Sequence, residues 1–191
     1  MDSPAGRARG WSPAESRGGP TWTCPKTWAQ ANASIAATIR KSAPDMARAL
    51  SLARTIQDNL DSLARPMDDL CAATCPWCPE PCCHTAVVWL DFPDLLFIHL
   101  AGHKPPPRQL RETTSGPCGY LSPKGCTLPR TLRPWVCTWY LCPTQKRVLA
   151  TWSQDAQDRV HTLVDHTTRT RRHLEHAFIK AATSVDVWQE R

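Results

Sequence analysis

The sequence lacks several features that are typical of common protein classes. No stretch contains the roughly 20 consecutive apolar residues that a membrane span requires, so we expect no membrane association. Residues 1–20 contain no apolar run of the length that a secretory signal needs. The chain also has no glycine-rich phosphate loop, no nucleophile elbow and no H-E-x-x-H motif, so nucleotide-binding and common hydrolase functions have no support. We therefore expect a cytoplasmic protein, whose thiols stay reduced.

Cysteine, by contrast, is abundant, with ten residues in a chain of 191. Eight of them fall into two groups, one of which is written C-P-W-C-P-E-P-C-C and the other of which ends in R-P-W-V-C-T-W-Y-L-C. Thiolates so close in sequence repel one another unless a bound metal compensates their charge. We therefore predict eight metal ligands: Cys75, Cys78, Cys82, Cys83, Cys118, Cys126, Cys137 and Cys142.

The spacing of the first group leaves the metal open. Cys75 and Cys78 form a C-x-x-C pair, which lets two thiolates bind one tetrahedral metal from a tight turn. Cys82 and Cys83 are adjacent, so their side chains diverge and serve either two metals or different irons of one cluster. Eight thiolates suit two closed zinc sites, or one to two iron–sulfur clusters. Two further interpretations stay open, namely an enzyme with one free coordination position and a redox switch formed by Cys82 and Cys83.

Four short motifs within residues 75–142 resemble the YkgJ-type cysteine-cluster family, which is described as zinc- or iron-chelating. They are C-P-W-C-P-E-P-C-C, C-G-Y-L from Cys118, Gly125-Cys126 and R-P-W-V-C from Arg133. The chain has three residues, not two, before its vicinal pair. The resemblance implies metal binding, often as an iron–sulfur cluster, and favours a 4Fe-4S cluster over zinc here. It also favours a second-shell role for Arg133, whose guanidinium would donate hydrogen bonds to thiolates and offset their charge.

The remaining polar candidates have simpler explanations. Cys24 stands alone and is interpreted as a free thiol, while Cys71 is held in reserve as a substitute ligand. His84 follows the vicinal pair, but a lone histidine is more often an ordinary polar residue than a ligand. Asp91 is interpreted as a helix cap in preference to an acid/base pair with Asp94.

The pattern of residues predicts a mainly α fold, in which helices pack around a cysteine-rich, irregular metal-binding core with little or no β structure. Residues 1–26 are rich in glycine, proline, serine and arginine, and we expect a disordered tail there. Residues 27–182 are predicted to form a single helical domain that contains the cysteine-cluster segment 71–142. Residues 183–191 are predicted to form a C-terminal tail.

Two helices are expected before the first cysteine group. The first covers Ala29–Lys41, and the second begins at a capping box formed by Ser42 and Asp45. The second helix is expected to extend to about Ala64 and to end at Pro66. Its buried stripe is predicted from the helical period: Met46, Leu50, Ala53, Ile56, Leu60 and Leu63.

Two further helices are expected beyond the first cysteine group. One follows the cap Asp91 and ends near Leu100, and a long one extends from the cap Ser153 to about Ala182. The segment 85–90 is apolar and β-branched, so we expect either a short strand or a buried extended segment. The inward residues of the long helix are predicted to be Val160, Leu163, Val164, Leu174, Ala177, Phe178 and Ala181.

The formal charge of +6 does not by itself indicate nucleic-acid binding. Basic residues collect late in the chain, but acidic residues accompany them, which is typical of a solvated helix. Part of the positive charge would compensate thiolates around a metal. We therefore expect a metal-binding protein with a structural or electron-transfer role, whose redox or protein partner the sequence does not identify.

Overall fold

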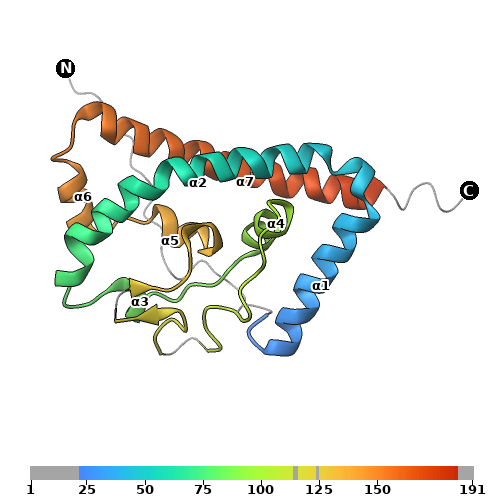
Figure 1. Cartoon of the computed structure of the whole chain (residues 1–191), viewed down its shortest axis with the longest axis horizontal. Helices are drawn as coiled ribbons and strands as arrows, with labels where there is room; N and C mark the ends of the chain where they lie inside the picture. The colour runs from blue at the N-terminus through green and yellow to red at the C-terminus, as the bar shows by residue number, and fades with distance from the viewer. Residues whose placement is uncertain (1–21, 114–115, 124, 185–191) are drawn as a thin grey trace, which may run out of the picture.

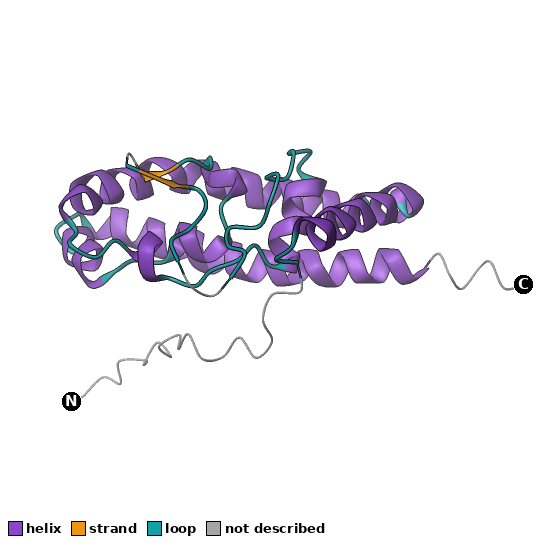
Figure 2. Ribbon diagram, turned by 90° about the horizontal axis from the view of Figure 1, so that it is seen from below, coloured by secondary structure: helices purple, strands orange, loops and turns teal. Residues whose placement is uncertain are grey.

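The computed structural model describes residues 22–113, 116–123 and 125–184, and helices predominate among them (Figures 1 and 2). The α-helices are α1 (Pro25–Lys41), α2 (Ala47–Thr74), α3 (Cys82–Thr85), α4 (Phe92–Leu100), α5 (Trp135–Trp139), α6 (Pro143–Leu149) and α7 (Gln154–Ser184). Three single turns of 3-10 helix are η2 (Ala43–Asp45), η3 (Cys75–Trp77) and η4 (Arg130–Leu132). The described sheet pairs β1 (Leu121–Ser122) with β2 (Gly125–Cys126) in antiparallel register. The predicted mainly α fold with little β structure is confirmed.

The long helices α2 and α7 lie side by side and run in opposite directions along the molecule (Figure 1). Apolar residues from both helices fill the space between them, and Leu63 of α2 and Leu174 of α7 are fully buried. The helical period of the apolar residues predicted these inward faces. Burial of each large aliphatic side chain contributes about 1.5–3 kcal/mol to the stability of the fold. Leu50 is the exception, since 36% of its surface is exposed.

The prediction that Pro66 ends the second helix is wrong, because α2 continues through it to Thr74. A proline inside a helix removes one backbone hydrogen bond and costs about 3 kcal/mol. The apolar stripe nevertheless continues on both sides of it, and Leu63, Met67 and Leu70 are all buried. Burial of these three side chains outweighs the cost of the proline. The extension carries Cys71 onto the last turns of α2.

The predicted capping box at Ser42 and Asp45 is also not formed. No side chain caps η2, and the buried hydroxyl of Ser42 has no hydrogen-bond partner within the described residues. The backbone N–H of Ser42 instead donates to the Thr38 carbonyl at 2.9 Å and closes α1. At its other end, α1 begins two residues before the expected domain boundary, where the Cys24 sulfur accepts from the Thr27 N–H at 3.4 Å.

The caps of the later helices agree with the sequence. Asp91 caps α4 by accepting from the Asp94 N–H at 2.7 Å, and Asp94 completes a capping box. The Ser153 hydroxyl accepts from the Ala156 N–H at the start of α7. Residues 86–90 form neither helix nor strand, and Leu90 at their end is buried.

None of the helices in the described ranges combines the length and the hydropathy that spanning a bilayer requires. Helix α7 continues to Ser184, two residues beyond the expected end of the domain. Most of the predicted N-terminal tail, residues 1–21, and most of the predicted C-terminal tail, residues 185–191, lie outside the described residues.

Candidate metal centre

All ten cysteines lie in the described part of the chain, and all are free thiols. The structure does not divide them as the sequence does, into one group of four before residue 84 and another after residue 117. Five of the predicted ligands gather in one place, which we call the five-cysteine cluster: Cys82, Cys83, Cys118, Cys126 and Cys137. Two more, Cys75 and Cys142, lie beside Cys71 instead.

Four separate segments bring the five-cysteine cluster together. The short helix α3 begins with Cys82 and Cys83, and the backbone N–H of Cys118 donates to the Cys83 carbonyl at 3.2 Å. Cys126 lies on β2, where it pairs with Leu121. The N–H of Leu121 also donates to the Cys118 carbonyl at 3.0 Å. Through Leu121, the hairpin therefore holds Cys118 near Cys126. Cys137 enters from α5.

The thiols of this cluster are close enough to change one another's ionisation. A hydrogen bond from Cys83 lowers the pKa of Cys82 to about 6, and the same bond raises the pKa of Cys83 far above its usual value. Part of the Cys137 surface is open to solvent, yet the surrounding protein desolvates the sulfur. This desolvation, followed by the charges of Cys126 and Cys118, raises the pKa of Cys137 to about 12. Such mutual repulsion is relieved when a metal ion takes up the thiolates.

A buried carboxylate fixes the helix that carries Cys137. Asp94 on α4 is 3% exposed, and its Oδ1 accepts from the backbone N–H of Trp135 at 3.0 Å, at the first residue of α5. Arg171 of α7 lies 2.7 Å from the same oxygen and 2.9 Å from Asp91 Oδ1. One carboxylate therefore ties three helices together.

The charges of this group support one another. Burial raises the pKa of Asp94, and the charge of Arg171 opposes that rise. Burial disfavours the charged form of Arg171, but the carboxylates of Asp94 and Asp91 raise its pKa above the usual value. These contacts do not support an acid/base role for Asp91 and Asp94, because their oxygens cap α4 and bind Arg171.

Two buried side chains order the irregular segments around the cluster. Gln109 accepts from the Leu90 N–H at 2.9 Å through Oε1 and donates to the Leu90 carbonyl at 3.1 Å through Nε2. Arg111 donates to the His84 carbonyl at 3.4 Å and also to the Gly116 carbonyl. These contacts satisfy backbone groups that neither helix nor sheet uses, so the loop beside α3 has a defined path.

Three other cysteines lie around the buried side chain of Gln145. Gln145 is 6% exposed, and its Nε2 lies 3.6 Å from the Cys71 sulfur and 3.8 Å from the Cys75 sulfur. Its backbone N–H donates to the Cys142 sulfur at 3.4 Å. The Nη2 of Arg130 lies 3.9 Å from the Cys71 sulfur. We call the three thiols Cys71, Cys75 and Cys142 the Gln145 cluster.

Among the described residues, Arg133 donates no hydrogen bond to a thiol. Its Nε donates to the Leu128 carbonyl at 2.9 Å, while Arg130 lies against Cys71. The motif R-P-W-V-C indicates Arg133, whose role beside a bound metal stays a prediction, and no sequence pattern marks Arg130. Gln145 could have been found, because it lies three residues after Cys142, the N-cap of α6, and completes a capping box there.

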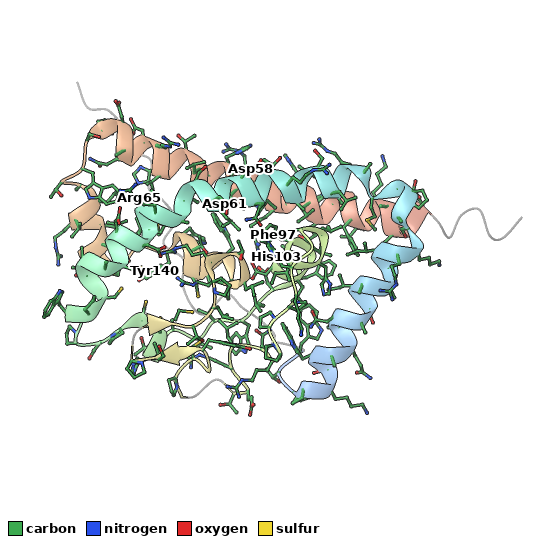
Figure 3. All side chains as sticks on the ribbon, in the orientation of Figure 1. Asp58, Asp61, Arg65, Phe97, His103 and Tyr140 are labelled. Carbon is green, nitrogen blue, oxygen red and sulfur yellow. The ribbon has the colours of Figure 1, made fainter. Side chains whose placement is uncertain are left out.

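The aromatic residues near the cysteines do not form a closed, dry shell. Trp135 is buried, but Trp77 is 83% exposed and Tyr140, labelled in Figure 3, is 41% exposed. Cys78 and His84 are also exposed. Solvent therefore reaches part of the candidate metal centre.

The cysteine side chains are suitable ligands for a thiophilic metal, but their positions in this structure are not yet those of a metal site. Free thiols are the ligands that zinc and iron–sulfur clusters prefer. Within the described ranges, however, no three cysteine, histidine or acidic side chains are arranged so that they could hold a metal ion. The sulfurs would have to move closer together to bind one. Comparisons of the chain with protein-family models, with curated proteins and with solved structures gave no match.

Proposed function

We propose that the protein binds a metal through the thiolates of the five-cysteine cluster. The supporting observation is that five free thiols from four segments, between 82 and 137, gather so closely that the charges of their neighbours help to raise the pKa of Cys83 and of Cys137. Gathering thiols in this way is unfavourable without a compensating cation. The resemblance of the cysteine motifs to the YkgJ-type family supports the same function.

The bound group would be an iron–sulfur cluster, with 4Fe-4S favoured by that resemblance, or zinc. Four ligands suffice for either, namely Cys118, Cys126, Cys137 and one thiol of the adjacent pair Cys82 and Cys83, so Cys137 is required. The residues Cys82 and Cys137 are partly open to solvent, so one edge of the centre would be accessible. An open edge suits electron exchange with a protein partner, and a structural role is compatible with the same ligands.

The deciding experiment is purification of the full chain without oxygen, followed by metal analysis and a visible spectrum. An iron–sulfur cluster gives a brown protein with broad absorption, which zinc cannot produce. Cys137→Ala should lose most of the metal, and the matched control Cys24→Ala should keep it, because Cys24 caps α1. Equal metal in both variants, or none in the unmodified protein, would refute the proposal.

One observation favours an enzyme as the second candidate. An open cavity of ≈ 300 Å³ lies beside Cys118, lined also by His84, Pro117, Leu121, Ser122 and Pro123. A small molecule in this cavity could reach a metal with a free coordination position. Cyanide or imidazole added to the metal-loaded protein should then shift its spectrum, and an unchanged spectrum would exclude the free position.

A further inference from the structure

We infer that the cysteines form two separate metal sites, and that the second is a tetrathiolate zinc site made by Cys71, Cys75, Cys78 and Cys142. This inference rests on the proposed function, since it assumes that the thiols bind metal. It assigns a ligand role to Cys71, which the sequence motifs leave outside the main set. It also moves Cys75, Cys78 and Cys142 away from the centre formed by the five-cysteine cluster.

The first argument is the bonding of Gln145, whose side-chain amide and backbone N–H contact cysteines. Its Nε2 faces the sulfurs of Cys71 and Cys75, and its backbone N–H faces the sulfur of Cys142. Its Oε1 accepts from the Cys142 N–H at 3.2 Å. One buried residue thus directs N–H groups at three sulfurs, two through its side chain and one through its backbone, and such outer contacts orient thiolate ligands and stabilise their charge.

The second argument is the charge placed beside these thiols. Arg130 is 8% exposed and points one Nη2 at Cys71, while its Nε donates to Asp68 Oδ1 at 2.8 Å. A zinc ion with four thiolates carries a residual charge of about −2, which a guanidinium partly offsets. The same Nη2 also donates to Asp68 Oδ1, so the guanidinium lies between a carboxylate and the Cys71 thiol.

The third argument is that helices, not loops, position the three sulfurs. Cys71 lies one turn before Cys75 at the end of α2, and Cys142 is the N-cap of α6. Helices α2 and α6 pack against each other. Ligands carried by packed helices keep their positions without a metal, so only a small adjustment would close the site.

The fourth ligand follows from the turn after α2. The N–H of Cys78 donates to the Cys75 carbonyl at 3.2 Å and closes the turn η3, which is the C-x-x-C arrangement that grips one tetrahedral zinc. Cys78 is exposed and belongs to neither cluster as the thiols now lie. Rotation of its side chain toward Cys75 would complete four sulfur ligands.

The two sites then use nine cysteines without sharing one. The five-cysteine cluster is built by α3, the β1–β2 hairpin and α5, and the second site by the ends of α2 and α6. The two groups are neighbours, since the charge of Cys82 adds to the raised pKa of Cys75 after the larger effects of burial and of Cys71. The tenth cysteine, Cys24, caps α1.

The test is titration of the metal-free full chain with Co²⁺, because cobalt bound by thiolates absorbs strongly. We expect the absorption of the unmodified protein and of Cys24→Ser to saturate at two equivalents. Cys71→Ser, Cys78→Ser and Cys137→Ser should each saturate at one, and the double variant Cys71→Ser/Cys137→Ser should not absorb. Gln145→Leu should keep two sites and weaken one of them by about 10- to 100-fold.

Three results would contradict the inference. Saturation of Cys71→Ser at two equivalents would remove Cys71 from the ligands. Loss of all cobalt in both Cys71→Ser and Cys137→Ser, from a parent that saturates at one equivalent, would indicate a single shared site; the proposed function would survive both results. Failure of the unmodified protein to bind cobalt, together with absence of metal after purification without oxygen, would refute the proposed function itself. Far-UV circular dichroism identifies any cysteine variant that has not folded. In that case the weaker cobalt binding expected of Gln145→Leu is the test of the second site.

Discussion

At the scale of single residues, the buried carboxylate of Asp94 has the widest influence. It accepts a hydrogen bond from the first residue of α5, forms an ion pair with Arg171 and completes the capping box of α4. Removing one partner of a buried ion pair leaves the other charge uncompensated, which costs more than the pair itself contributes. Asp94 therefore stabilises both the helical scaffold and the position of Cys137.

We expect Asp94→Asn to lower the free energy of unfolding by about 3 kcal/mol, because Arg171 would keep only Asp91 as an ionic partner. Urea denaturation measures the change. The matched control is Asp69→Asn, whose partner Arg65 is 92% exposed on the surface of α2, and its effect should stay below about 1 kcal/mol. Equal effects of the two substitutions would contradict the role assigned to Asp94.

A second residue carries an unused polar group. The Ser42 hydroxyl is 1% exposed and finds no partner within the described residues, so it loses its hydrogen bonds to water on folding. Ser42→Ala should raise the free energy of unfolding by about 1 kcal/mol. Thr167→Val is the control, since the buried Thr167 hydroxyl donates to the Leu163 carbonyl at 2.7 Å, and it should destabilise. Destabilisation by Ser42→Ala, seen in thermal or urea unfolding, would show that its hydroxyl is bonded.

The same scale shows where sequence reasoning succeeds and fails. The cap at Asp91 could be predicted, because a cap depends on residues three positions apart. The choice between Arg130 and Arg133 could not, because it depends on which of them faces Cys71 across 59 residues or more. A motif names residue types, but only the folded chain decides which side chain reaches a thiol.

At the scale of elements, α2 gains its last two turns against the preference of its own sequence. Pro66 interrupts the backbone hydrogen bonds, yet the buried residues on both sides continue the helix. A prediction from local signals ends the helix at the proline, since packing against α7 and α6 is not encoded locally. These extra turns bring Cys71 and Cys75 to Gln145.

Pro66→Ala should stabilise the protein by about 2 kcal/mol. The substitution restores a helical hydrogen bond worth up to about 3 kcal/mol in helix preference, and the more flexible unfolded chain takes back about 0.4–1 kcal/mol. Chemical denaturation gives the value, with Ala64→Gly as a control that should destabilise by about 1 kcal/mol. A destabilised Pro66→Ala protein would mean that the proline itself fits the path of α2.

At the scale of the whole molecule, the helical class and the inward faces of α2 and α7 could be predicted, because a period of 3.6 is visible in one sequence. The partition of the thiols could not. The sequence suggests groups of four before and after the loop, whereas folding places Cys82 and Cys83 with the later cysteines and Cys142 with the earlier ones. Cys71 and Gln145, for example, are neighbours in space although 74 positions separate them in the sequence.

The helices pack through the hydrophobic core, whereas loops carry much of the five-cysteine cluster, so removal of the metal should affect them differently. The buried hydrophobic core includes no cysteine, although Cys118 and Cys126 pack against it. The described residues of the segment 101–134 form only two short strands and one single turn. A chelator should therefore leave the helical circular dichroism nearly unchanged and make this segment sensitive to trypsin.

Limited proteolysis with mass spectrometry locates the cuts. Cys137→Ser without chelator should reproduce the pattern of the chelated protein, and Cys24→Ser should not. Identical digestion with and without chelator, or a collapse of the helical signal, would contradict this independence of the scaffold from the metal.

The backbone contact between Cys118 and Cys83 has a consequence for the unfolded chain. At this contact, segments that are distant in the sequence meet. A metal bound there by both Cys82 and Cys137 would close a loop of roughly 55 residues. By analogy with a disulfide, such a closure removes conformational freedom worth roughly 4 kcal/mol from the unfolded state. The bound ion would thus act as a reversible cross-link, whose strength the cell could set through the supply of metal.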